Sequence, residues 1–148
     1  MLSEGHVVGF HSMDHQNAMV RGYLHTRKDF RTGSEFMKRK GISDIWYRPP
    51  WGLTNLFSWH LARKYGMKMV LWDVMAEDWE RGATAGSIRK KCLSRVKDGS
   101  ILCLHDGGRR TGGAPGAPEK TLEALTYVIP ALKEAGCRFI LPSEAVFR

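Results

Sequence analysis

The sequence lacks any long apolar run. No stretch approaches the roughly 18 residues that a membrane-spanning helix needs, so no transmembrane segment is expected. Its first residues, Met1–His6, have neither the basic start nor the apolar core of a secretory signal peptide. Internal repeats, low-complexity stretches and linker-like segments are also absent. These absences predict one soluble domain from 148 residues, with the cellular compartment left open.

Cysteine is scarce. The three residues, Cys92, Cys103 and Cys137, are an odd number and contain no Cys-x-x-Cys pair, so a disulfide framework is not expected. All three lie inside apolar, periodic segments. We therefore expect them to be small buried hydrophobic residues.

Acidic residues are outnumbered, with 23 Lys and Arg against 15 Asp and Glu and a formal net charge of +8. Such a balance suits a polyanionic partner. However, the basic residues are spread along the chain, without a long basic tail or an RNA-binding motif. A solvated basic surface is therefore the expectation, and nucleic acid is not the expected partner.

Three polar, helix-favouring segments each end at a glycine that leads directly into an apolar run. These glycines are Gly41, Gly66 and Gly136. Lys and Arg in a last turn favour the C-terminal end of a helix, and glycine just past that end adopts the left-handed capping conformation. Each glycine therefore predicts the end of a helix and the start of a strand.

Apolar spacing predicts two further helices. The helix expected over Ser87–Lys97 has one apolar stripe, formed by Ile88, Cys92 and Val96. Another helix is expected after Pro118, with a kink at Pro130. Its stripe comprises Leu122, Leu125, Ile129 and Leu132.

Five apolar runs are predicted to be strands. Met67–Val74 and Ser100–His105 are nearly continuous apolar runs, typical of strands that are buried on both faces of a parallel sheet. The shorter candidates are Val7–Phe10, Ile45–Tyr47 and Arg138–Leu141. Because strands and helices then alternate along the whole chain, the sequence predicts an α/β fold with a parallel sheet or barrel.

Polar side chains follow these strands. In α/β folds the chemistry lies at the C-terminal ends of the strands. His11 follows the first expected strand and Arg48 the second, while Asp73 and Asp78 follow the third and His105 ends the fourth. This arrangement predicts an active site at that edge of the fold.

The segment His11-Ser12-Met13-Asp14-His15 places two imidazoles four residues apart. Both can bind one metal ion if the segment turns helically. It is not the zincin pattern, because Ser12 stands where that pattern has its glutamate base. The alternative is a pair of unrelated surface histidines, since two ligands do not complete a metal site.

In Arg48-Pro49-Pro50-Trp51-Gly52, two prolines fix the backbone after a strand and Gly52 permits an unusual turn. Such a segment can aim an arginine side chain and a backbone N–H at a reacting group. A strand end followed by a turn and a helix cap is the alternative interpretation.

Three carboxylates and two indoles follow the third expected strand, within residues 72–79. Trp79 is a candidate wall of a sugar site, and Asp78 is a candidate partner that orients a histidine. Asp73 and Asp78 equally fit ordinary loop residues, and this is the favoured interpretation for Glu77.

His105 closes a strongly apolar strand and is followed by Asp106. A histidine at this place in an α/β fold is positioned to act as a general acid or base. The competing interpretation is a core histidine whose hydrogen bonds are satisfied internally.

Taken together and in order, these segments resemble the polysaccharide deacetylase family, the NodB-type carbohydrate esterases. The family's second motif, His-(Ser/Thr)-x-x-His, matches residues 11–15, and its third, Arg-x-Pro-x-Gly, matches residues 48–52. The fourth motif ends in Asp-Trp, as does Asp78-Trp79, and the fifth, Leu-x-Leu-His-Asp, matches residues 102–106. The likeness covers nearly the whole chain.

The resemblance implies a distorted (β/α) barrel that removes acetyl groups from N-acetylated sugars. His11 and His15 would be two of three protein ligands of a divalent metal, zinc or cobalt, which acidifies a water molecule. Arg48 would hold the catalytic base. His105, tuned by Asp78, would protonate the leaving amine.

The resemblance also implies where an N-acetylated oligosaccharide or polysaccharide would bind. The backbone N–H of Trp51 would stabilise the oxyanion together with the metal. The side chains that border the acetyl and sugar pockets would be those of Trp51, Trp79 and Leu104.

The sequence departs from the family in its first motif. Thr-Phe-Asp-Asp-Gly, which supplies the base aspartate and the third metal ligand in the family, is absent, and only ten residues precede His11. Residues 1–148 are therefore expected to be the C-terminal two-thirds of a single deacetylase catalytic domain, an N-terminally truncated barrel. Its open edge would invite self-association. Met75 also stands where the family often has an acidic or polar residue.

Three functions remain open on the sequence. The leading one is a metal-dependent carbohydrate N-deacetylase, a hydrolase of non-peptide C–N bonds, whose activity in this shortened chain is in question. The second is a non-catalytic saccharide-binding remnant of that fold, in which Trp51 and Trp79 serve as stacking surfaces. The third is a basic nucleic-acid binder, which would show a steep salt dependence.

Overall fold

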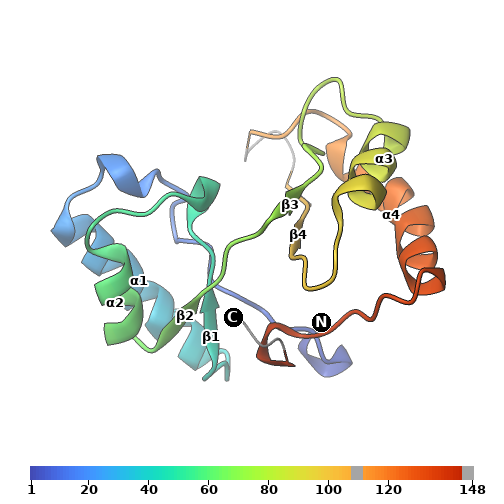
Figure 1. The fold of residues 1–148 in the computed structure, drawn as a ribbon. Coiled ribbons are helices and arrows are strands. Elements are labelled where there is room, and N and C mark those ends of the chain that lie inside the picture. The colour runs from blue at the N-terminus through green and yellow to red at the C-terminus, as the bar shows by residue number, and fades with distance from the viewer. Residues whose placement is uncertain (108–111, 145–148) are drawn as a thin grey trace. The chain divides into compact units, whose positions relative to one another are not determined.

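A computed structural model describes residues 1–107 and 112–144. The chain forms two compact units, Met1–Leu71 and Trp72–Arg148. Each unit contains one pair of parallel strands joined by a helix, with another helix packed nearby (Figure 1). The mixed α/β fold expected from the sequence is thereby confirmed.

The first unit is built on strand β1 (Ile45–Tyr47), which pairs in parallel with β2 (Met67–Met69) and places residue 45 opposite residue 67. Helix α2 (Ser58–Lys64) joins these strands and packs against β2, while α1 (Tyr23–Arg39) packs against α2 (Figure 1). Single 3₁₀ turns lie at Leu2–Glu4, Ala18–Val20 and Pro50–Gly52.

The core of the first unit forms between its helices and its strands. Phe10 contributes to this core, and its ring lies 5.5 Å from that of Tyr47, centroid to centroid. Gly33 lets α1 approach Phe10 closely, because a Cβ at position 33 would lie 2.2 Å from the end of the Phe10 ring. The buried set comprises Phe10, Phe30, Met37, Ile45, Tyr47, Leu61, Ala62 and Met67. Since Phe10 directly precedes His11, this packing fixes the start of the first candidate motif.

The second unit is built on β3 (Val74–Met75), which pairs in parallel with β4 (Leu102–Cys103). Helices α3 (Ala85–Arg95) and α4 (Ala117–Glu134) pack side by side (Figure 1). A capping box between Thr84 and Ser87 starts α3, and a 3₁₀ turn spans Pro142–Glu144. The buried core comprises Ala76, Ala83, Ile88, Cys92, Ala124, Val128 and Leu132.

The three predicted helix ends are confirmed. Helices α1, α2 and α4 end just before Gly41, Gly66 and Gly136, whose φ angles are 77°, 69° and 85°. Only glycine adopts this left-handed conformation without a steric penalty.

The predicted strands are shorter than expected. Only Ile45–Tyr47 forms at its predicted bounds. From the expected strand Val7–Phe10, only Phe10 pairs, in an isolated bridge to Tyr47, because Val7 and Gly9 are exposed. The run Met67–Val74 is divided between β2 and β3, which pair with different partners in the two units.

The last two strand predictions also need correction. Of Ser100–His105, only Leu102–Cys103 is strand. Arg138–Leu141 does not pair with any described strand, and the side chain of Phe139 within it is 55% exposed. An apolar run shows that a segment avoids water, but the availability of a neighbouring strand decides whether it pairs.

Two predictions of burial are wrong. Cys92 and Cys103 are buried and free, but Cys137 is exposed. On α4, Leu132 is buried as predicted, but Leu122 and Ile129 are exposed, and the rest of the buried stripe consists of smaller residues: Ala117, Thr121, Ala124 and Val128. Small side chains let α4 approach α3 closely, which explains why the larger leucine lies outside.

Within residues 1–107 and 112–144, no helix is long and apolar enough to cross a membrane.

Candidate active site

The histidine motif forms a tight loop that brings its two imidazoles together. The rings of His11 and His15 lie 5.0 Å apart, centroid to centroid, at an interplanar angle of 71°. The ring of His15 also lies 4.7 Å from that of Trp51. Two motifs separated by more than thirty positions in the sequence therefore meet in the first unit.

A hydrogen bond to the backbone orients His11. Its Nδ1 lies 2.7 Å from the carbonyl oxygen of Arg48. Because a carbonyl oxygen only accepts, Nδ1 carries the hydrogen and the lone pair of the neutral ring is on Nε2. Metal-binding histidines characteristically donate their second ring N–H to a carbonyl or carboxylate in this way.

The loop has a strained backbone. Ser12 and His15 have φ angles of 67° and 50°, and Trp51 has a φ of 53°. Residues with a Cβ rarely adopt this left-handed region, and such conformations persist only where surrounding contacts hold them. Both histidine-bearing and arginine-bearing loops therefore depend on contacts with the rest of the first unit.

The segment after β1 forms a tight turn, as the two prolines and Gly52 predicted. Pro49 and Pro50 are buried, and the N–H of Gly52 donates to the carbonyl of Pro49 at 2.9 Å. Arg48 donates from Nη2 to the carbonyl of Leu71 at 3.4 Å. The side chain of Trp51 is 57% exposed, so its indole is accessible beside His15.

Asn55, which the sequence analysis missed, fastens the loop after Trp51 to the loop after His15. Its side-chain amide donates to the carbonyls of Ala18 and Arg21 and to the hydroxyl of Thr26, at 3.0, 3.0 and 2.9 Å. Its side-chain oxygen accepts from the backbone of Phe57 at 3.0 Å. A lone asparagine gives no signal of such a role in a single sequence.

The two imidazoles alone are an incomplete metal site. Among the described residues, no three His, Cys, Asp or Glu side chains are grouped to hold an ion. Zinc sites use three or four protein ligands. The oriented ring of His11 and its approach to His15 fit two ligands of a divalent ion, and a further ligand has to complete the set.

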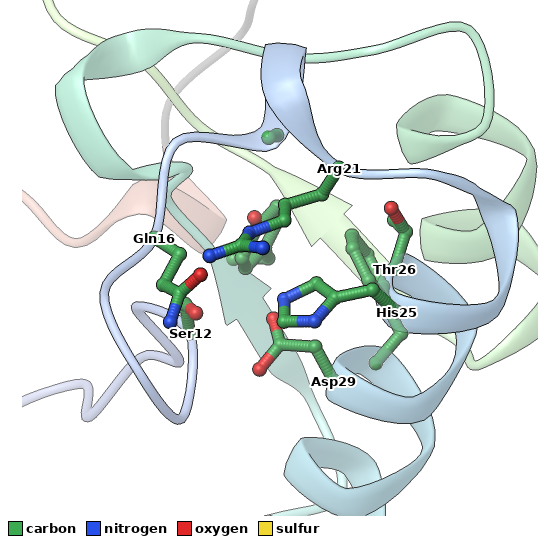
Figure 2. A pocket seen from close by; sticks show the side chains of 9 residues that line it. Ser12, Gln16, Arg21, His25, Thr26 and Asp29 are labelled. Carbon is green, nitrogen blue, oxygen red and sulfur yellow. The ribbon is translucent and has the colours of Figure 1, made fainter.

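A small polar pocket lies behind the histidine loop (Figure 2). Its cavity of about 10 Å³ has room for one water molecule, far too little for a sugar. In Figure 2 the side chains of Arg21, Gln16 and His25 point into this space, with the Asp29 carboxylate below. The full lining comprises Ser12, Gln16, Ala18, Arg21, His25, Thr26, Asp29, Phe30 and Tyr47.

The second unit holds a histidine–aspartate pair. Asp78 is fully buried and accepts two hydrogen bonds from His105, from ring Nδ1 at 2.9 Å and from the backbone N–H at 2.7 Å. The hydroxyl of Thr121 on α4 donates a third, at 3.0 Å. The His105 side chain is 40% exposed, so its outer nitrogen can be reached from solvent.

These contacts set the charge of Asp78. Burial raises the pKa of this carboxyl, but the hydrogen bonds from the ring and backbone of His105 and from Thr121 outweigh burial. The net pKa of Asp78 lies below its ordinary value, so the carboxylate is ionised at neutral pH. The predicted orienting role of Asp78 therefore has a structural basis, with Thr121 as an additional partner.

Trp79 lies against the same histidine. Its ring centroid is 4.8 Å from that of His105, and it lines an open hollow of about 360 Å³. Leu104 is partly buried against the core of the second unit. The other residues that line the hollow are Glu80, Arg81, Gly112, Gly113, Ala114 and Pro115.

Two carboxylates near this pair have structural contacts. Glu77 pairs with Lys91 at 2.7 Å and with Arg95 at 2.8 Å, which fastens the turn before Asp78 to α3. Asp73 accepts from Ser100 and from the backbone of Ile101. The loop interpretation of Glu77 is confirmed, and the ion pairs add an anchoring role.

The comparisons with known proteins agree with these motifs. Residues 1–70 match the family model described as polysaccharide deacetylase. A peptidoglycan-N-acetylglucosamine deacetylase of Bacillus cereus is 31% identical over 97% of this chain and 65% of that protein. A chitooligosaccharide deacetylase of Azorhizobium caulinodans is 29% identical over 90% of this chain and 66% of that protein.

Solved structures show the same fold. A peptidoglycan N-acetylglucosamine deacetylase superposes with a TM-score of 0.82 at 29% identity, over 95% of this chain and 64% of that chain. A family 4 acetyl xylan esterase from Clostridium thermocellum, in complex with a cobalt ion, gives a TM-score of 0.80 at 26% identity, over 97% of this chain and 65% of that chain.

The chain spans 65% of the length of the first of these relatives, and 50% of a second Bacillus cereus deacetylase that is 32% identical. In its ordered motifs, its NodB-type (β/α) fold and its sequence, the chain is similar to the polysaccharide deacetylase family, whose model matches residues 1–70.

Proposed function

We propose that this protein takes part in the metal-dependent removal of acetyl groups from N-acetylated saccharides. The observation that carries the proposal is the His11–His15 pair, whose first ring is oriented by the carbonyl of Arg48. The relatives named as peptidoglycan and chitooligosaccharide deacetylases support the substrate class.

His11 and His15 would hold the divalent ion, zinc or cobalt, together with a ligand from outside this pair. When bound, such an ion supplies Lewis acidity and lowers the pKa of water. The aspartates of a Thr-Phe-Asp-Asp-Gly motif are the ligand and the base that the family resemblance assigns, and Arg48 would hold that base. We therefore expect catalysis from a protein that contains both this chain and that motif.

His105 would act as the general acid. The hydrogen bond from Nδ1 to Asp78 fixes the ring, so a protonated His105 offers the hydrogen on Nε2 to the leaving amine. The amine departs neutral when the acetamide C–N bond breaks. Asp78 is ionised, so it accepts the Nδ1 hydrogen and keeps the ring in one orientation.

Trp51, Trp79 and Leu104 would contact the saccharide. The accessible indole of Trp51 and the ring of Trp79, which lines the hollow, offer apolar surface to the faces of sugar rings. The backbone N–H of Trp51 would donate to the oxyanion that forms on the acetamide oxygen.

The test is acetate release from N-acetylglucosamine oligomers with zinc or cobalt, in a protein that joins this chain to a Thr-Phe-Asp-Asp-Gly segment. We expect His105→Ala to lower the rate constant about 100-fold or more, as loss of a general acid does. We expect His11→Ala to abolish the metal-dependent activity. His60→Ala, at an exposed histidine on α2, is the matched control and should leave activity unchanged. No acetate release from the joined protein would refute the proposal.

The hollow beside Trp79 favours a second candidate, a non-catalytic saccharide-binding domain. In that case chitooligosaccharide binding would persist with a chelator and in His11→Ala, and would be lost in Trp79→Ala. Isothermal titration calorimetry measures this binding. Acetate release that depends on His11 would indicate the deacetylase, whereas binding that does not depend on His11 and is not accompanied by acetate release would indicate the binding domain.

A further inference from the structure

The turn between the two imidazoles needs outside support. Ser12 and His15 both have positive φ angles, 67° and 50°. In each of these residues the left-handed backbone brings the Cβ close to the following carbonyl oxygen, so the turn carries a steric cost. Whatever holds residues 12–15 in place therefore also determines whether the His11 and His15 rings face each other.

Asp29 on α1 makes the central contact with this turn. Its Oδ1 accepts the backbone N–H of Met13 at 2.8 Å. The hydroxyl of Ser12 lies between this carboxylate and that of Asp14, to which it donates at 3.1 Å. Burial raises the pKa of Asp29, and the hydrogen bonds from Met13 and Ser12 offset this only in part.

A second contact comes from the same face of α1. His25 precedes Asp29 by four residues, which places both side chains on one face of the helix, and both line the small pocket (Figure 2). His25 Nε2 lies 3.4 Å from Oδ2 of Asp14. Two side chains of one helix thus hold the turn at Met13 and at Asp14.

Helix α1 is a firm support for these contacts. It spans 17 residues and buries Phe30, Gly33 and Met37. Phe10 packs directly over Gly33, and Phe10 is the residue before His11. The same helix therefore fixes the start of the histidine motif through Phe10 and its centre through Asp29.

We propose that Asp29 is a positioning residue for the His11–His15 pair. By accepting the N–H of Met13 and contacting Ser12, it holds the turn in the left-handed conformation that faces the two imidazoles toward each other. The inference deepens the proposed function, because the pair it positions is the pair that would bind the metal. Among the described residues, Asp29 is not grouped with the two imidazoles as a metal ligand.

The test compares three substitutions at position 29 in the full chain. Asp29→Asn keeps an oxygen that accepts from Met13, Asp29→Glu displaces the carboxylate by one methylene, and Asp29→Ala removes it. Asp44→Ala is the matched control, because Asp44 is an exposed aspartate of the same unit that pairs with Lys68. Circular dichroism and the dispersion of backbone amide signals report whether each variant is folded.

Two readouts address the pair directly. Long-range ¹H–¹⁵N spectra of the imidazoles show whether His11 remains the Nδ1–H tautomer that donates to Arg48, and titration with Zn²⁺ or Co²⁺ gives the affinity. We expect Asp29→Ala and Asp29→Glu to lose the single tautomer signature and to lower the affinity about tenfold, a typical effect of removing the partner of a metal ligand. Asp29→Asn should retain both to within about threefold, and Asp44→Ala should match the unmodified chain.

Unchanged imidazole spectra and affinity in folded Asp29→Ala would overturn the inference. If Asp29→Ala does not fold, Asp29→Glu is the deciding variant. Imidazole spectra and metal affinity equal to those of the unmodified chain would then show that Asp29 does not position the pair. Should the unmodified chain bind neither ion, the tautomer spectra alone decide the role of Asp29, and the proposed function is tested separately by acetate release from the joined protein.

Discussion

At the scale of single residues, the second unit depends on one buried carboxylate. Asp78 receives hydrogen bonds from groups that are distant in the sequence, two from His105 and one from Thr121. A buried carboxylate in such a setting stabilises the fold only while it is ionised and fully hydrogen-bonded.

The substitution Asp78→Asn tests this dependence. Because the pKa of Asp78 is lowered by folding, its stabilisation is complete above the unfolded pKa of about 3.9 and is lost as the pH falls through the lower folded pKa. We expect the variant to lose about 1–3 kcal/mol of unfolding free energy at pH 7, and the difference to shrink below pH ~3. Urea unfolding at several pH values measures both.

Asp98→Asn is the control for this experiment, since Asp98 is an exposed aspartate of the same unit. An equal loss in both variants, or a difference that does not change with pH, would contradict the assignment of the acid-sensitive carboxylate to Asp78.

Thr121 provides a second test at this scale. Thr121→Val keeps the shape of the side chain but removes the hydroxyl that donates to Asp78. We expect a loss of about 1–2 kcal/mol and a rise in the pKa of Asp78 toward its ordinary value, followed by the carboxyl signal in ¹³C NMR. Thr126→Val on the same helix removes a hydroxyl that donates to the carbonyl of Glu123, and it should leave that pKa unchanged.

At the scale of secondary-structure elements, helix α1 supports the histidine motif through its contact with Phe10. Gly33 lies in the middle of this helix, where alanine is ordinarily favoured by about 1 kcal/mol. Here a Cβ would lie 2.2 Å from the ring of Phe10, which is itself 5% exposed and enclosed by the core. The steric conflict outweighs the helical preference.

We therefore expect Gly33→Ala to destabilise the protein by about 1–3 kcal/mol, the cost of overpacking a core. Gly86→Ala on α3 is the matched substitution with open space around it, because the nearest atom to its Cβ would be 3.8 Å away. That variant should be stabilised by about 0.5–1 kcal/mol. Thermal unfolding of the two variants should show shifts of opposite sign, and equal shifts would contradict the packing argument.

The elements also show what a sequence can predict. The helix ends at Gly41, Gly66 and Gly136 were predictable, because a positive φ angle is a local requirement. The division of Met67–Val74 into two strands was not, since it depends on which strand lies beside each half. The buried stripe of α4 was predicted incorrectly for a related reason: where α4 packs closely against α3, Ala124 is buried and Leu122 is not.

The candidate site follows the same rule. The motif residues were found from local patterns, and the contacts of His11 with Arg48 and of His105 with Asp78 join residues that these patterns named. The supporting residues Asp29, Asn55 and Thr121 were missed, because each bonds to a partner that only the folded chain brings close. The role of each motif residue in catalysis stays a prediction.

At the scale of the whole molecule, each unit has an apolar core that contains neither His11 nor His15. The side chain of His11 is exposed and that of His15 is half-buried. The fold of this chain therefore does not rest on the ion that these histidines would bind, in contrast to small zinc domains that unfold without metal.

Removal of metal tests this statement. We expect a chelator to change the melting temperature of the chain by less than about 3 °C, since weak binding by two ligands adds little stabilisation at ordinary metal concentrations. Differential scanning calorimetry with and without chelator measures the shift. A decrease of about 10 °C or more would show that an ion supports the fold, contrary to this expectation.

The side-chain amide of Asn55 makes the candidate site sensitive to slow deamidation. Its nitrogen donates to three oxygens, those of Ala18, Arg21 and Thr26. Spontaneous deamidation, which converts an asparagine side chain to a carboxylate, would place a negative oxygen against the carbonyl oxygens of Ala18 and Arg21. This change of one dalton would therefore separate the two loops that bring His15 and Trp51 together. A preparation that deamidates on storage would lose the arrangement of its histidine site before it lost its fold.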